Sequence, residues 1–153
     1  MSWTAYPEID QVLAALLSES RALLGDDLFG MYLFGSLTSG GFDEETSDID
    51  FVVVTRSDPM ARQTELGALN RRIQASGSPW AAKLEGSFLP LRVFEDFNPA
   101  GTMFPTIGMG GWYGLDHTRA SSARCSASCC ASMALPWWVP SRGASSRRSI
   151  RKT

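Results

Sequence analysis

In the first part of the chain, hydrophobic residues recur with helical spacing in one segment and form strand-like runs in two others. From Pro7 to Leu24 the apolar residues mark one helical face, which predicts an amphipathic helix that stops at Gly25. The runs 28–34 and 49–55 are rich in aromatic or β-branched residues and predict strands on either side of a glycine-bearing segment. Helices mixed with strands in this order indicate an α/β domain.

A second helix and a third strand follow along the chain. Ser57 or Asp58 can cap the helix, Pro59 fits its first turn and Gly77 fits its end. Residues 83–91 then have the composition of a strand. The second helix is therefore predicted to be a crossover between two strands.

Residues 92–116 contain two prolines and five glycines, and we expect them to be rich in loops. Two adjacent aromatic residues, Trp112 and Tyr113, lie in this segment. Packing inside the protein is their expected role, and stacking on an adenine or a sugar is the alternative.

Composition indicates one globular domain in the cytoplasm. The 153 residues suffice for a single domain with a core, at 44% hydrophobic and 20% charged residues. No apolar run approaches the roughly 20 residues of a membrane span, and the N-terminus lacks the pattern of a signal peptide. We therefore expect no membrane partner.

Acidic residues mark the entrance to the second predicted strand. Because side chains alternate along a strand, Asp48 and Asp50 should point the same way, with Cα atoms about 6 to 7 Å apart. Two carboxylates so close repel each other unless a cation lies between them, and magnesium favours such oxygen ligands. Asp43, Glu44 and Glu45 lie in the preceding glycine-led loop, which we expect to be flexible and to leave them solvated.

A glycine and a serine end the first predicted strand. Gly35 has no Cβ, so that a phosphate could approach its backbone, and Ser36 adds a hydroxyl at the start of what reads as a short helix. Phosphates would then lie between amide donors on one side and a metal ion on the other.

These motifs resemble the nucleotidyltransferase superfamily, whose fold is polymerase-β-like with a small mixed sheet flanked by helices. The details Gly40-Gly41 and Ser47-Asp48-Ile49-Asp50-Phe51 are most similar to the aminoglycoside adenylyltransferases of the streptomycin and spectinomycin resistance type. The resemblance covers about residues 1–117. It implies that Glu85, on the strand after the crossover helix, completes a metal site with Asp48 and Asp50 and takes part in removing the acceptor proton.

The resemblance implies a Mg²⁺-dependent enzyme that transfers a nucleoside monophosphate, AMP from ATP, to a hydroxyl of a small molecule such as an aminoglycoside. Asp48, Asp50 and Glu85 would be catalytic residues and metal ligands, and Gly35 and Ser36 would bind the nucleotide. Two alternatives stay open: a minimal nucleotidyltransferase antitoxin that acts on a protein toxin, and an inactive relic.

The C-terminal residues have a different composition. All 16 acidic residues and seven of the 14 basic ones precede residue 117, whereas residues 117–153 hold seven basic residues, no acidic residue, nine serines and all three cysteines. A basic tail can indicate a nucleic-acid partner, and cysteines can indicate zinc, but the spacing of Cys125, Cys129 and Cys130 fits no common zinc motif.

We interpret this tail as the product of another reading frame. If the codons for residues 128–153 are taken one base earlier, permitted codon choices encode a different sequence. That sequence resembles the segment that follows the catalytic domain in relatives of this family. We therefore predict a nucleotidyltransferase domain at 1–117, a frameshift between about Asp116 and Cys129, and a poorly ordered tail at 118–153. Loss of the C-terminal region of the family would impair activity, and nucleic acid is not the expected partner.

Overall fold

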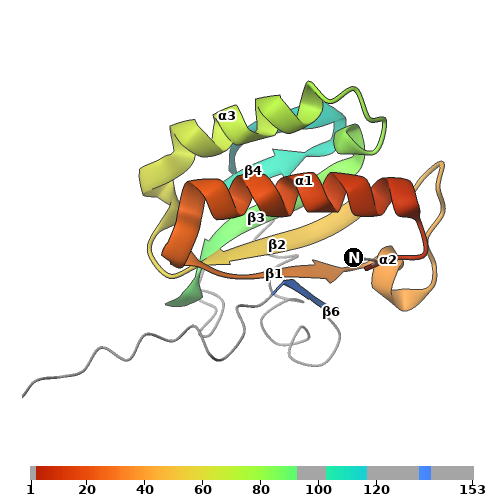
Figure 1. The fold of residues 1–153 in the computed structure, drawn as a ribbon, viewed down its shortest axis with the longest axis horizontal. Coiled ribbons are helices and arrows are strands. Elements are labelled where there is room, and N and C mark those ends of the chain that lie inside the picture. The colour runs from red at the N-terminus through yellow and green to blue at the C-terminus, as the bar shows by residue number, and fades with distance from the viewer. Residues whose placement is uncertain (1–2, 93–102, 117–134, 139–153) are drawn as a thin grey trace, which may run out of the picture.

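The protein is a mixed six-stranded sheet with two long helices on one face (Figure 1). A computed structural model describes residues 3–92, 103–116 and 135–138. The strand order is β5-β4-β3-β2-β1-β6, in which β2 and β3 are parallel and the other pairs antiparallel. The main elements are α1 (Pro7–Leu24), β1 (Leu28–Phe34), α2 (Ser36–Ser39), β2 (Ile49–Thr55), α3 (Gln63–Gln74), β3 (Leu84–Pro90), β4 (Phe104–Gly108), β5 (Trp112–Asp116) and β6 (Leu135–Trp138).

The predicted helices and first three strands are confirmed. Helix α1 begins at Pro7 and ends before Gly25, whose φ of 54° suits a residue without Cβ. Helix α3 is the crossover between β2 and β3, and it is entered through the 3₁₀ turn η2 (Pro59–Arg62). The α/β class predicted from the sequence is therefore the observed one.

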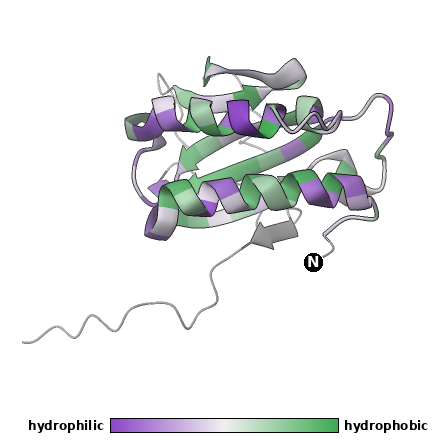
Figure 2. Ribbon diagram, turned by 45° about the horizontal axis from the view of Figure 1, so that its top comes forward, coloured by the Kyte–Doolittle hydropathy of each residue, from purple (hydrophilic) through white to green (hydrophobic). Residues whose placement is uncertain are grey.

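The sheet separates two apolar clusters. The larger one lies between the sheet and the two helices, and most strand residues between the helices are hydrophobic (Figure 2). It includes Ile49, Phe51 and Leu84 together with the inner faces of α1 and α3. A smaller cluster of Val52, Val54, Leu89 and Phe104 belongs to the opposite face, as strand alternation requires. We call this opposite face the open face because neither α1 nor α3 covers it, although the side chains of its apolar cluster are themselves buried.

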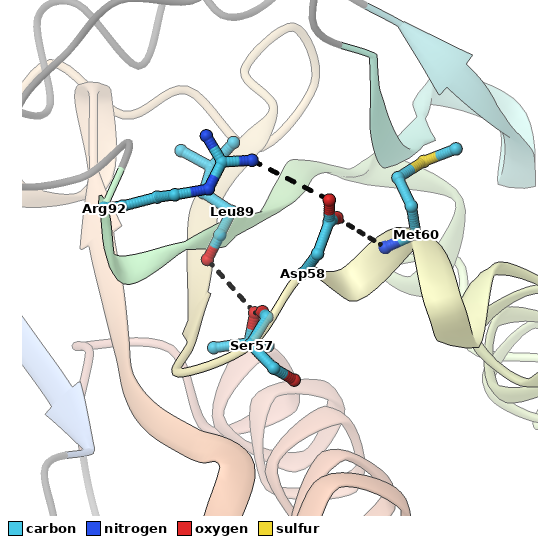
Figure 3. Close-up of polar contacts among 6 residues, drawn as sticks. Ser57, Asp58, Met60, Leu89 and Arg92 are labelled. Carbon is cyan, nitrogen blue, oxygen red and sulfur yellow. Dashed lines mark hydrogen bonds and ion pairs between the residues drawn. The ribbon is translucent and has the colours of Figure 1, made fainter.

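Polar contacts close one end of β2 and β3, which we call the crossover end. Both carboxylate oxygens of Asp27 accept hydrogen bonds from Ser57, from its backbone N and from its Oγ, each at 2.8 Å. Asp58 accepts a hydrogen bond from Met60 N at 3.0 Å, which caps η2, and lies 3.7 Å from Arg92 Nη2 (Figure 3). Aspartates at this end thus stabilise the entry to the crossover helix.

The prediction of loops at residues 92–116 is wrong for 104–116. These residues form β4, the 3₁₀ turn η4 (Met109–Gly111) and β5, with Pro105 opposite Leu115. Proline and glycine locally disfavour strands, but pairing with a neighbouring strand overrides this local preference. Residues 93–102 lie outside the described residues.

Part of the unusual tail forms a strand. Leu135–Trp138 is β6, and it pairs antiparallel with β1 through Met31, Tyr32 and Leu33. The other residues of the predicted tail lie outside the described residues, and the frameshift stays a prediction. None of the helices in the described ranges is long and apolar enough to cross a membrane.

Candidate functional site

Three carboxylates converge at the end of β2 and β3 opposite to the crossover end. In the parallel register Asp50 lies beside Glu85, and Asp48 immediately precedes the first paired residue of β2, Ile49. One carboxylate oxygen from each of Asp48, Asp50 and Glu85 lies within 4.8 Å of the other two. The predicted proximity of these residues, which we call the acidic triad, is confirmed.

Strand alternation places the acidic triad on the open face. Ile49, Phe51 and Leu84 are buried beneath the helices, so their strand neighbours Asp50 and Glu85 point to the other side of the sheet. All three triad residues are half-buried. A half-buried set of hard oxygen donors fits a divalent cation, which would offset the repulsion between the carboxylates.

Gly35 lies directly against Asp50. Its φ of 73° and ψ of −150° belong to a region that side chains rarely tolerate. A Cβ at this position would overlap the Asp50 carboxylate. A glycine is therefore required here, because a side chain would collide with Asp50 of the acidic triad. The sequence alone did not reveal this reason. Ser36 follows as the first residue of the short helix α2 and is half-buried.

The loop before the acidic triad is fixed by its own hydrogen bonds. Asp43 Oδ1 accepts from Glu45 N at 2.8 Å and from Thr46 N at 3.2 Å, and Ser47 Oγ accepts from Asp43 N at 2.9 Å. The backbone bonds from Glu45 and Thr46 hold the pKa of Asp43 below its usual 3.8. Asp43, Glu44 and Glu45 are exposed, as expected, and their loop contains a hydrogen-bonded turn.

Tyr113 packs against α3 and is not directed to the open face. Its hydroxyl donates to Gln63 O, and its ring lies where a Cβ on Gly67 would be. Burial raises the pKa of Tyr113 to about 12. The expected packing role is confirmed for this residue.

Trp112 lies on the open face, in line with the acidic triad. Gly86 of β3 pairs with Ile107 of β4. In this antiparallel register, the next residues, Glu85 on β3 and Gly108 on β4, lie opposite each other. Gly108 in turn pairs with Trp112 of β5. The indole covers Gly108, since a Cβ there would lie 3.0 Å from Trp112 Cε3, and it is 48% exposed. The sequence signal for this alignment is the alternation of side chains along β5, which separates Trp112 from Tyr113, but the glycines around β5 hide that strand.

One comparison with known proteins agrees with this geometry. The model of the nucleotidyltransferase domain family matches residues 13–90, from within α1 to the end of β3. The matched segment contains the acidic triad, Gly35 and Ser36. A comparison with curated proteins gives no match. Because the match extends over half of the chain, the chain belongs to the nucleotidyltransferase domain family.

Proposed function

We propose that this nucleotidyltransferase transfers AMP from ATP to a hydroxyl group of a small molecule, an aminoglycoside or a similar polyol. The observation that carries the proposal is the acidic triad, three carboxylates from two neighbouring strands within 4.8 Å. The motifs that resemble the streptomycin and spectinomycin adenylyltransferases supply the acceptor class.

In this proposal Asp48, Asp50 and Glu85 hold Mg²⁺. The bound ion would neutralise charge on the phosphates and lower the pKa of the acceptor hydroxyl. Glu85 is the third ligand or the base that accepts the hydroxyl proton. The acceptor oxygen forms a bond to the α-phosphorus, the bond between the α- and β-phosphates breaks, and pyrophosphate leaves. No covalent intermediate with the protein is needed.

The two sides of the acidic triad suit different parts of the reaction. Gly35 and Ser36 follow β1 on one side, where they would hold the β- and γ-phosphates of the leaving group. Because attack and departure are roughly in line, the acceptor should approach from the opposite side. That side is the open face over β4 and β5, where the half-exposed Trp112 offers an apolar surface to a sugar ring.

Labelled ATP tests the proposal directly. The full chain is incubated with MgCl₂, ATP labelled at the α-phosphate, and a panel of aminoglycosides or a cell extract. We expect label on a small molecule, and a loss of at least about 100-fold in Asp48→Ala, because even residues behind metal ligands contribute about 10 to 100-fold. Glu45→Gln, an exposed carboxylate of the neighbouring turn, is the matched control and should keep its activity.

Other outcomes separate the alternatives. Label on a protein in the extract would favour an antitoxin acting on a protein partner over a small-molecule enzyme. No transfer to any acceptor would favour the relic. Transfer that persists in Asp48→Ala would contradict the proposed site.

A further inference from the structure

We infer that Lys83 is a positioning residue that fixes Asp48 for metal binding, an inference that rests on the proposed metal site. Lys83 ends the 3₁₀ turn η3 (Ala81–Lys83), immediately before β3. Its Nζ donates a hydrogen bond to the backbone carbonyl of Glu44, in the turn that leads to Asp48. The same ammonium group lies 4.9 Å from the centre of the Trp80 ring.

A second contact fastens the same turn to the same segment. The rings of Phe42 and Trp80 lie 6.2 Å apart between centroids, and Phe42 lies 5.0 Å from Tyr6 at the start of α1. The turn is therefore attached at Phe42 by aromatic packing and at Glu44 by the hydrogen bond from Lys83. Both contacts are made by residues of the segment 80–83, Trp80 in the first and Lys83 in the second.

The contact of Lys83 connects the supports of two triad residues. In the register of β2 and β3, Ile49 pairs with Leu84, so that Asp48 and Lys83 each come one residue before this pair. Two residues beyond Lys83 lies Glu85. Asp43 and Ser47, which flank the turn that contains Glu44, exchange two hydrogen bonds that close this turn just before Asp48. Lys83 thus links the segment that leads to Asp48 with the segment that leads to Glu85.

A positioning role and a purely electrostatic role predict opposite results for metal binding. A cation close to the acidic triad repels a divalent ion, so that charge alone would make removal of the Lys83 ammonium tighten metal binding. If Lys83 instead fixes Asp48, its removal should weaken metal binding. The sign of the change therefore distinguishes the two roles.

Metal titration of the full chain provides the test, with Mn²⁺ as the probe and electron paramagnetic resonance as the measure of free ion. We expect Lys83→Met to raise the dissociation constant about tenfold, in the range found for residues that support metal ligands. Lys83→Arg should restore it, because a guanidinium can donate to the Glu44 carbonyl and stack on Trp80. Arg71→Met removes an exposed cation of α3 and should change nothing.

Hydrogen exchange of the metal-free protein is a second readout. Amides of residues 43–48 should exchange faster in Lys83→Met than in the wild-type chain, and at the wild-type rate in Arg71→Met. Trp80→Leu keeps the Lys83 charge but removes the ring that Lys83 and Phe42 contact, so it should weaken Mn²⁺ binding in the same direction. This variant also serves if Lys83→Met does not fold.

The outcomes separate this inference from the proposed function. If the wild-type chain does not bind Mn²⁺, the proposed metal site fails and this inference fails with it. If the wild-type chain binds Mn²⁺ and Lys83→Met binds it equally well or more tightly, the metal site stands and the positioning role of Lys83 is overturned. Unchanged exchange of residues 43–48 in Lys83→Met would also overturn it.

Discussion

Carboxylates lie at both ends of β2 and β3, and their surroundings differ. At the crossover end, Asp27 and Asp58 each have their own donors, the amide and hydroxyl of Ser57 for the first and the amide of Met60 for the second. At the other end, Asp48, Asp50 and Glu85 face one another within 4.8 Å. A single aspartate at a strand end thus does not indicate a functional site, whereas several carboxylates that converge do.

The two ends should respond to mutation in opposite ways. Donors around a single carboxylate stabilise the fold, so that its removal costs stability. Carboxylates that crowd one another raise the free energy of the metal-free fold, so that removing one relieves repulsion. We expect removal of a carboxylate to cost mainly function at the triad end and mainly stability at the crossover end.

The largest effect is expected for Asp50→Asn. This substitution keeps the shape of the side chain and removes one charge from the acidic triad. Nucleotidyl transfer should fall by at least about 100-fold, while the melting temperature of the metal-free protein should be equal or higher. Labelled transfer and thermal unfolding measure the two quantities. A variant that loses stability and activity together would break the contrast between the two ends.

Gly35→Ala should damage the triad end through the backbone. The new Cβ would overlap the Asp50 carboxylate, and the φ of 73° is strained for alanine. We expect a loss of about 1 to 3 kcal/mol in the free energy of unfolding and a fall of about 10 to 100-fold in Mn²⁺ affinity.

Gly40→Ala is its matched control. Gly40 has a φ of 85°, but a Cβ there would meet nothing within 4 Å. This variant should lose about 1 to 2 kcal/mol of stability from backbone strain and keep its Mn²⁺ affinity. Equal loss of affinity in both variants would show that the Asp50 contact is not what Gly35 provides.

Asp58→Ala tests the crossover end. The carboxylate caps η2 and lies beside Arg92, both in exposed positions. Loss of the cap should lower the free energy of unfolding by about 1 kcal/mol, and Mn²⁺ affinity should not change. Chemical denaturation measures the first quantity. Weaker metal binding in this variant would mean that the two ends are coupled.

The smallest effect is expected for Asp43, a carboxylate near the acidic triad that has its own donors. Backbone amides of Glu45 and Thr46 lower its pKa from 3.8, so its contribution to stability is present above pH 3.8 and is lost as the pH falls through the lower, folded value. The melting temperature of Asp43→Ala should therefore approach that of the wild-type chain in acid. An unchanged difference between them across this range would contradict the assignment.

Sequence patterns predicted the parts of the structure that depend on local spacing. Apolar periodicity gave α1, β2 and the crossover helix, and alternation placed Asp48 and Asp50 together. Glu85 came from family resemblance, because its distance from Asp50 depends on the pairing of β2 with β3. The site itself was thus predictable where a family pattern supplied the strand pairing.

Contacts between distant segments were beyond prediction. Pro105 and the surrounding glycines hid β4 and β5, since their strand conformation depends on neighbouring strands rather than on their own preferences. The overlap between Gly35 and Asp50, and the bond from Lys83 to the Glu44 carbonyl, arise only after folding. Residue spacing in the sequence does not predict such contacts.

The central claim is that carboxylates of β2 and β3 bind a nucleotide through a divalent ion. The most direct measurement is the melting temperature of the full chain with and without MgCl₂ and ATP together, for the wild-type chain and for Asp50→Asn. We predict that MgCl₂ and ATP together raise the melting temperature of the wild-type chain more than either ligand does alone, and that Asp50→Asn lacks this additional rise. An equal rise in the variant would contradict it.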